Sequence, residues 1–270
     1  MKGARRPELP VPEPYEGGGL EPDGDYDGLE FKDADLGGQD GSGARFMDCA
    51  LTGCALDETR LRHARILDSA LSGVRGVGTD LAEATLRDVE LTDARLGGPQ
   101  LHGAVLERVL IRGGKIDCLN LRTARLRDVV FEGCVLVEPD FGGARLERVE
   151  FVDCALKGAD LHAATLVDVD LRGAAPLEIG RGLDRLSGAV ISPAQLNGPG
   201  TGAGGAVGDP GGGVSADTAG VRPLRGSVGS GPGGSRSPGS RRGRRAGRSG
   251  RRSGRAGSPG PPGAVRRGRR

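Results

Sequence analysis

The stretch Ala124-Arg125-Leu126-Arg127-Asp128-Val129-Val130-Phe131 contains a pattern that starts again every five residues. A small residue is followed by a polar residue, then a large aliphatic or aromatic residue, then two more polar positions. Stepping by five from Leu126 gives 29 positions between Phe31 and Leu171, and 27 of them are Leu, Ile or Phe. A period of five matches neither an α-helix nor plain strand alternation, so it predicts a repeat array.

The five-residue unit can hold a short strand and a corner. Two inward-facing residues are separated by one outward-facing residue, as in a β-strand, and the last two residues can turn the chain. Four units would then return the chain to its start after 20 residues, giving about seven coils between residues 28 and 173. A separate 20-residue period supports this geometry, because the small position is alanine on one side of successive coils: Ala44, Ala64, Ala84, Ala104, Ala124, Ala144 and Ala164. The same spacing predicts one buried leucine ladder: Leu86, Leu106, Leu126, Leu146 and Leu166.

The units Ala34-Asp35-Leu36 and Ala159-Asp160-Leu161, with their degenerate copies, resemble the pentapeptide-repeat family. The resemblance covers roughly residues 26–196. It implies an all-β fold, a right-handed quadrilateral β-helix. It implies less about activity, because most members have no assigned activity and the best understood ones bind DNA gyrase by imitating DNA.

Composition divides the chain into four parts. Residues 1–25 are rich in Pro and Gly and are predicted to be a flexible leader. Residues 26–175 are predicted to form the β-helix, and residues 176–196 to cap its C-terminal end. Residues 197–270 have no aromatic residue and no apolar periodicity, which predicts a disordered basic tail rich in Gly, Arg, Ser and Pro.

The sequence predicts local structure at three places where the repeat is interrupted or has ended. Gly76 replaces a large inward residue, so a bulge or a bend is expected over residues 74–78. Pro176 occupies the first failed centre, and a short closing helix is expected over residues 177–186. The signature Ser192-Pro193-Ala194-Gln195 predicts a helix start, which the following Gly and Pro residues cut short.

The sequence shows no apolar segment that fits a signal peptide or a membrane span, so no membrane contact and a cytoplasmic location are expected. Without a secretory signal, the cysteines are interpreted as free thiols and not as a disulfide framework. Cys118 is expected to point outward. The other four occupy the small inward position and are predicted to be buried: Cys49, Cys54, Cys134 and Cys154.

The net charge of +2 hides two opposed parts. Residues 201–270 hold 15 Arg and 2 Asp, a net of +13, whereas residues 1–200 hold 23 basic and 34 acidic residues, a net of −11. Three interpretations of the tail stay open: a nucleic-acid-binding arm, a segment that folds back on the acidic part, and an out-of-frame translation of a GC-rich gene. The loss of helix-forming sequence directly after Gln195 favours the third. The candidate nucleic-acid contacts of the first are Arg241, Arg242, Arg244, Arg245, Arg248, Arg251 and Arg252.

The outward positions form columns with a 20-residue spacing. One column is the candidate interaction surface, with Arg60 as an interruption: Asp40, Asp80, Asp140 and Asp160. A second column is basic: Arg45, Arg65, Arg125 and Arg145. At one corner the signs alternate from coil to coil, which predicts a ladder of ion pairs that fixes the register: Arg87-Asp88, Glu107-Arg108, Arg127-Asp128 and Glu147-Arg148.

No catalytic triad, phosphate loop or metal-ligand spacing stands out, so the sequence predicts no enzyme, no cofactor and no metal site. A non-catalytic scaffold that presents a rigid rod to a protein partner ranks first. A DNA mimic that binds DNA gyrase, with protection against fluoroquinolones, ranks second. It ranks second because residues 42–200 are only weakly acidic, with 19 basic and 23 acidic residues. The interrupted terminal helix predicts a monomer.

Overall fold

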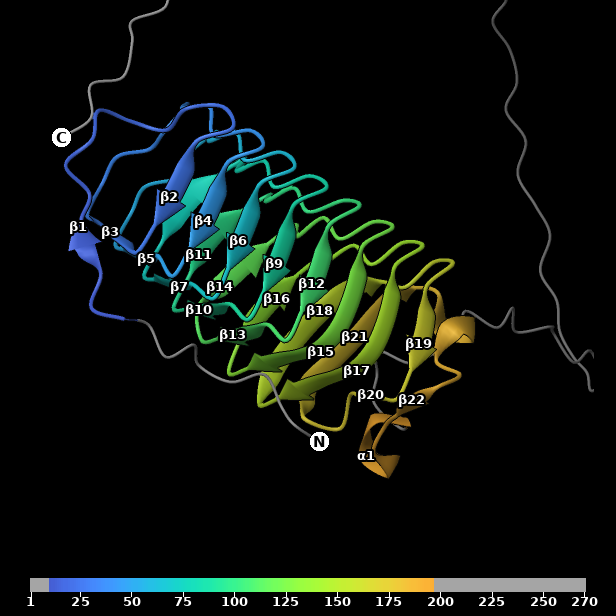
Figure 1. Ribbon diagram of the computed structural model, residues 1–270. Helices are drawn as coiled ribbons and strands as arrows, with labels where there is room; N and C mark the ends of the chain where they lie inside the picture. Colours follow the sequence, from blue (N-terminus) through green and yellow to red (C-terminus); the bar gives the residue numbers. More distant parts are fainter. Residues whose placement is uncertain (1–9, 197–270) are drawn as a thin grey trace, which may run out of the picture. The chain divides into compact units, whose positions relative to one another are not determined.

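The computed structural model describes residues 10–196. These residues form a four-sided β-helix whose faces are built from short parallel strands (Figure 1). The chain divides into two units, Met1–Asp209 and Pro210–Arg270, and the described residues all lie in the first. Strand pairing links each residue to the one about 20 positions later, so each coil lies directly on the coil before it. The predicted fold class is confirmed, but the β-helix has about nine coils and not the seven that were predicted.

Two of the four faces belong to one 16-stranded sheet. The first face contains β2 (Asp25–Asp27), β4 (Arg45–Met47), β6 (Arg65–Leu67), β9 (Thr85–Arg87), β12 (Val105–Glu107), the start of β15 (Arg125–Glu132), the start of β17 (Arg145–Val152) and β19 (Thr165–Val167). The second face contains β1 (Glu13–Pro14), β3 (Leu29–Lys32), β5 (Ala50–Thr52), β7 (Ala70–Ser72), β10 (Glu90–Thr92), β13 (Leu110–Arg112), the ends of β15 and β17, β20 (Val169–Asp170) and β22 (Ala189–Val190). The two faces count as one sheet because β15 and β17 continue through the corner between them.

The third face is a separate six-stranded sheet. It contains β8 (Arg75–Val77), β11 (Arg95–Gly97), β14 (Lys115–Asp117), β16 (Val135–Val137), β18 (Cys154–Asp160) and β21 (Ala174–Arg181). The fourth face is held by single parallel bridges in one stack: Asp40, Arg60, Asp80, Gln100, Asn120, Asp140 and Asp160. The outward side chains of each face therefore form straight columns.

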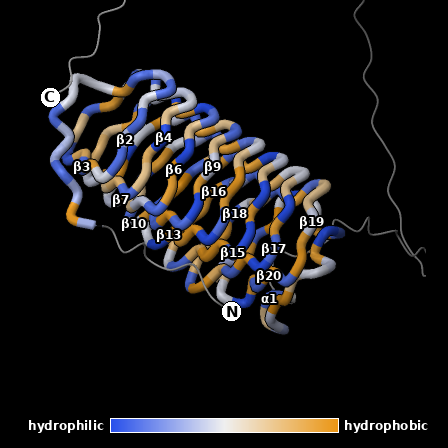
Figure 2. The backbone as a smooth tube through the Cα atoms, viewed as in Figure 1, coloured by the Kyte–Doolittle hydropathy of each residue, from blue (hydrophilic) through white to orange (hydrophobic). Residues whose placement is uncertain are grey.

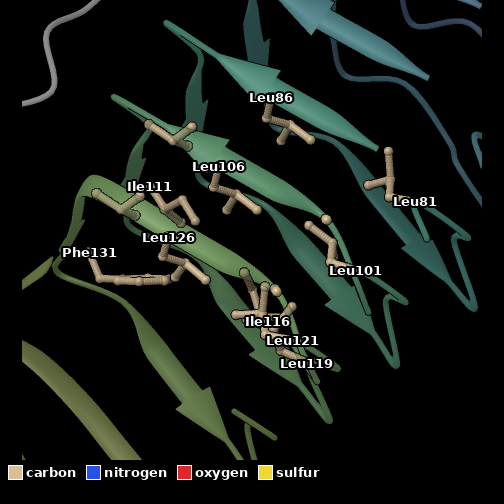
Figure 3. Packing of buried hydrophobic residues seen from close by; sticks show 14 of the residues in the cluster. Leu81, Leu86, Leu101, Leu106, Ile111, Ile116, Leu119, Leu121, Leu126 and Phe131 are labelled. Carbon is tan, nitrogen blue, oxygen red and sulfur yellow. The ribbon is translucent and has the colours of Figure 1, made fainter. Parts of the chain in front are cut away.

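The interior is filled by the large residue of every unit. Hydropathy alternates along each coil between inward apolar and outward polar positions (Figure 2). The predicted leucine ladder is confirmed, because Leu86, Leu106, Leu126, Leu146 and Leu166 pair in register and are all buried. Figure 3 shows the first three of them. Phe131 and Phe151 extend this packing on the second face, with ring centroids 4.8 Å apart and planes 3° apart.

The corners explain why Asp and Gly recur after each strand. Corner residues adopt left-handed backbone angles, with φ of 55° at Asp88 and 56° at Asp128. Aspartate tolerates this conformation better than most residues with a side chain, and glycine adopts it freely. The residues between the inward positions therefore turn the chain as well as face the solvent.

Gly76 does not mark a bulge, so that part of the expectation is wrong. Strand β8 pairs with β11 without a shift, and Gly76 lies opposite Leu96. A Cβ added at Gly76 would lie 2.7 Å from the carbonyl carbon of Leu56. The glycine is needed because the backbone approaches the preceding coil closely there, and the regular coil continues through it.

The N-terminal end is ordered further out than the sequence predicted. Residues 1–25 were expected to form a flexible leader, but β1 pairs with β3, and the Tyr15 ring packs against Phe31 in a tilted arrangement with ring centroids 4.3 Å apart. Tyr26 and Phe46 continue this aromatic cluster, and Leu20 is buried beside it. Residues 13–25 therefore cover the first coil, because their aromatic and apolar side chains have a hydrophobic end to shield.

The C-terminal end differs from the predicted closing helix over residues 177–186. That expectation is wrong: β21 runs to Arg181, and only the 3₁₀ turn η1 (Leu183–Arg185) is helical there. The predicted helix start is confirmed as α1 (Pro193–Leu196). Gln195 accepts a hydrogen bond from the Ser192 amide at 2.6 Å and donates to the carbonyls of Leu171 and Ala174 at 2.8 and 2.7 Å. One side chain thus starts the helix and caps the last coil.

Candidate functional site

The acidic column of the fourth face is the candidate surface that the sequence singled out. The structure places its four aspartates in one stack, as the spacing required: Asp40, Asp80, Asp140 and Asp160. Only Asp140 and Asp160 are direct neighbours. Arg60 separates Asp40 from Asp80, and two amide side chains, Gln100 and Asn120, occupy the middle of the column.

Each of these aspartates has a local structural role. Its Oδ1 accepts a hydrogen bond from the backbone amide two residues later, which closes a turn at the corner. The donors are Ser42 at 3.0 Å, Ala82 at 3.0 Å, Gly142 at 2.7 Å and His162 at 2.7 Å. The hydrogen bond from Ser42 is the main reason why the pKa of Asp40 lies below its usual range.

Each aspartate is also paired with an arginine. The pairs are Arg60 with Asp40 at 3.3 Å, Arg62 with Asp80 at 3.1 Å, Arg122 with Asp140 at 3.1 Å and Arg181 with Asp160 at 3.2 Å. The Asp160 side chain is only 17% exposed. The column is therefore neutralised along its length and is not a continuous acidic stripe.

The alternating ladder between the first and second faces is present. Arg108 donates from Nε and Nη2 to the two carboxylate oxygens of Asp88, both at 2.6 Å. Arg148 repeats this geometry on Asp128 at 2.6 and 2.9 Å. The hydrogen bonds from Arg148 hold the pKa of Asp128 below its usual range. The ladder ties successive coils together, as expected.

The same corner column contains three stacked aspartates on the earlier coils: Asp48, Asp68 and Asp88. Burial raises the pKa of Asp68, and the charges of Asp88 and Asp48 raise it further. Arg108 compensates Asp88 at one end of the stack. Asp68 therefore sits between two like charges, which costs stability when all three are ionised.

The cysteines lie where the repeat predicted. Cys49, Cys54, Cys134 and Cys154 are buried, and Cys118 is exposed. Burial raises the pKa values of the Cys49 and Cys54 thiols. Thiols in this state are poor nucleophiles.

The interior offers little room for a ligand. An apolar cavity of about 50 Å³ lies among the stacked side chains between Leu56 and Leu121. Small-molecule sites usually measure about 300 to 1,000 Å³. Among residues 10–196, no three His, Cys, Asp or Glu side chains are grouped to hold a metal ion. No helix in this part of the chain is long and apolar enough to cross a membrane.

The arginines proposed as nucleic-acid contacts lie outside the described residues: Arg241, Arg242, Arg244, Arg245, Arg248, Arg251 and Arg252. A different basic set lies within them and was missed in the sequence. Arg75, Arg95 and Lys115 are stacked neighbours on the third face. The signal that could have found them is the same 20-residue spacing that gave the other columns.

Two family profiles match the chain. One, described as "Pentapeptide repeat region", matches residues 44–121, and the other, described as "Pentapeptide repeats (8 copies)", matches residues 140–174. No curated protein matches.

Solved structures also resemble the chain. HetL, a pentapeptide repeat protein involved in heterocyst differentiation regulation from the cyanobacterium Nostoc sp. strain PCC 7120, is 25% identical, with 63% of this chain and 90% of that chain covered and a TM-score of 0.27. Full-length QnrB1, a plasmid-mediated fluoroquinolone resistance protein, is 16% identical, with 64% of this chain and 86% of that chain covered and a TM-score of 0.26.

Proposed function

This chain is a pentapeptide-repeat protein, and we propose that it acts as a non-catalytic scaffold that binds another protein through its outer faces. The observation that best supports this proposal is the unbroken register between successive coils. Pairing follows the 20-residue spacing without a shift from β2 to β17, and the first register shifts occur between β18 and β21. Outward side chains are therefore held at fixed positions on flat faces, which suits recognition of a partner surface.

The interior supports a binding role over a catalytic one. The large inward residues fill the helix, and the remaining cavity is lined almost entirely by apolar side chains such as Leu86 and Leu106. The four inward cysteines are buried in the same core. Nearly all charged side chains project outward, and many of them form ion pairs between coils, such as Arg148 with Asp128.

The experiment is a comparison of the four faces. The full chain is used to capture proteins from its native cells, and the capture is repeated with one exposed charge reversed on each face. The four variants are Arg65→Glu, Arg112→Glu, Arg95→Glu and Arg60→Glu, on the first to fourth faces. A genuine partner should be lost with one variant and retained with the other three. Retention of every captured protein by all four variants, and by the heat-denatured chain, would refute the scaffold.

A DNA mimic that binds DNA gyrase is the second candidate. The direct stacking of Asp140 on Asp160 favours it, because duplex DNA presents closely spaced negative charges. The ion pairs of these residues with Arg122 and Arg181 oppose it.

A supercoiling assay with the full chain separates the candidates. Asp140→Asn with Asp160→Asn removes both charges and leaves an oxygen for the turn amides. A DNA mimic should inhibit gyrase and lose that inhibition in this double variant. Full supercoiling at saturating protein would exclude the mimic, and inhibition unchanged in the variant would point to a site elsewhere in the chain. Fluoroquinolone protection would be followed in parallel as the level of drug-stabilised DNA cleavage.

A further inference from the structure

Three cations are stacked in one column on the third face. Arg75, Arg95 and Lys115 pair in register through β8, β11 and β14, and all three side chains are exposed. Neighbouring strands lie about 4.8 Å apart, so the column spans about 10 Å. Three positive charges are thus aligned along the axis of the β-helix.

Arg95, at the centre of this column, lacks the ion pairing found at many other positions of the rod. The guanidinium of Arg95 has no ion-pair or hydrogen-bond partner within residues 10–196. Arg75 donates only to the backbone carbonyl of Gly53, at 2.9 Å, and Lys115 pairs with Asp117 at 2.7 Å. Like charges stacked on adjacent strands are destabilising. The corner ladder avoids this cost by alternating its signs, whereas this column retains it, as the stacked Arg45 and Arg65 of the first face also do.

The surface beside these cations is hollow and partly apolar. Gly97 leaves the outer backbone uncovered. The hollow between the cations and the neighbouring column is also lined by Val77 and by the carboxylates Asp57 and Asp117, so the three cations leave its lining with a net charge of +1. Val77 is 64% exposed, one of the few large apolar side chains that the described rod turns to solvent. A ligand that fits this surface therefore combines negative charge with an apolar group.

The borders of the hollow limit the kind of ligand. Asp57 and Glu58 are exposed on the coil directly below Arg75, so the basic run ends there. A nucleic acid is a long continuous polyanion that would extend past the hollow over both carboxylates, whereas a short segment can end beside Arg75. A second copy of the chain is also a poor fit. Three strands cover only about 150 to 200 Å² of a face, against about 800 Å² per partner in a stable interface.

We propose that this hollow binds a short acidic peptide segment of the partner protein, in extended form and along the axis of the β-helix. This inference rests on the proposed scaffold function. Side chains on one side of an extended peptide repeat at about 7 Å, so two carboxylates fit among three cations that span about 10 Å. An apolar residue of the segment would contact Val77, and the carboxylates would pair with Arg75, Arg95 and Lys115.

The test uses the full chain and a fluorescein-labelled synthetic peptide of alternating glutamate and leucine that carries a photo-reactive group. A peptide with glutamine in place of glutamate is the ligand control. Binding is measured at about 0.15 M ionic strength, where unspecific attraction between exposed charges is screened beyond about 8 Å. The cross-linked residues are then located by mass spectrometry.

The variants are Arg95→Glu, Arg95→Gln and the matched control Arg65→Glu. Arg65 is an exposed arginine on the first face that also stacks on another arginine, Arg45. All three variants carry the same tail, so any binding by the tail is common to them. Thermal unfolding verifies that each variant folds.

We expect cross-links within residues 75–117 and a loss of affinity of about tenfold or more with Arg95→Glu, because a charge-assisted contact becomes a repulsive one. Arg95→Gln should give a smaller loss and Arg65→Glu a change of less than about twofold. Equal affinities for the Arg95 and Arg65 variants, or cross-links elsewhere, would overturn the inference. If oligothymidylate displaces the labelled peptide from the cross-linked residues at a lower concentration than the unlabelled peptide does, the hollow would be assigned to nucleic acid instead. If the peptide fails while a captured partner still depends on a different face, the acidic-segment inference falls and the scaffold stands.

Discussion

The bidentate pair Arg148–Asp128 should contribute measurably to the stability of the β-helix. Arg148 donates two hydrogen bonds of 2.6 and 2.9 Å to Asp128 across adjacent coils, and the two side chains are only 28% and 23% exposed. Exposed pairs are worth about 0.2 to 1 kcal/mol, and hydrogen bonds to charged groups about 1.5 to 3 kcal/mol. For a partly covered pair we expect a coupling energy between these ranges, about 1 kcal/mol.

A double-mutant cycle in urea isolates this coupling. The variants are Asp128→Asn, Arg148→Gln and the double substitution, and the backbone cost of the left-handed φ at both positions cancels in the cycle. Arg60–Asp40 is the matched control, because it joins adjacent coils through one contact of 3.3 Å with side chains 54% and 38% exposed. Its coupling energy should stay below about 0.5 kcal/mol.

The coupling should also depend on pH. The pKa of Asp128 is lowered in the folded state, first by the hydrogen bonds from Arg148. Because unfolded aspartate has a pKa of about 3.9, the pair stabilises the fold fully above that pH. The contribution is lost as the pH falls through the lower folded pKa. A coupling energy no larger than that of the control pair, or one that persists in strong acid, would refute this account of the ladder.

Three further substitutions test other parts of the structure. Leu126→Ala should lower the free energy of unfolding by about 2 to 5 kcal/mol, because Leu126 is 1% exposed in the middle of the leucine ladder; a loss below about 1 kcal/mol would contradict that packing. Asp68→Asn should raise the free energy of unfolding by about 0.2 to 1 kcal/mol near pH 7 and have no effect near pH 3. Burial and two stacked aspartates raise the folded pKa of Asp68, so its contribution is present below the unfolded pKa and lost as the pH rises through the folded pKa. Gln195→Ala should speed amide exchange in the last coil, because the carbonyls of Leu171 and Ala174 lose their donor; unchanged exchange would argue against the cap.

The sequence predicted most of the fold because the repeat is a local rule. A large residue every fifth position fixes which side chains point inward, and the 20-residue columns then follow from geometry. Leu126, the buried cysteines and the Arg148–Asp128 pair all lie where that rule puts them. Gly76 was misjudged because the spacing shows that a side chain is missing, and it does not show how closely the Leu56 backbone approaches.

The ends and the candidate surface were harder to predict, because they depend on contacts that the repeat does not specify. Tyr15 reaches back onto Phe31, and nothing in the local sequence reveals that contact. The spacing placed Asp140 and Asp160 in one column but could not show the arginines that neutralise them. Arg122 lies outside that column, and Arg181 is opposite Asp160 only because the register shifts between β18 and β21. Columns can be read from the sequence, whereas ion pairs across columns require the structure.

The central claim is that each 20-residue coil is an interchangeable layer of a continuous β-helix. Duplicating residues 105–144 in the full chain adds two whole coils and preserves the alternating signs of the ladder. A matched variant lacks the last residue of the duplicated segment, so that every later inward side chain shifts out of phase. Urea unfolding of the two variants tests the claim. The whole-coil duplication should unfold cooperatively, at a midpoint no lower than that of the parent and with a steeper denaturant dependence, whereas the matched variant should lose the stability of the coils after the insertion. Equal behaviour of the two variants, or loss of cooperative unfolding in the whole-coil duplication, would contradict the layered β-helix.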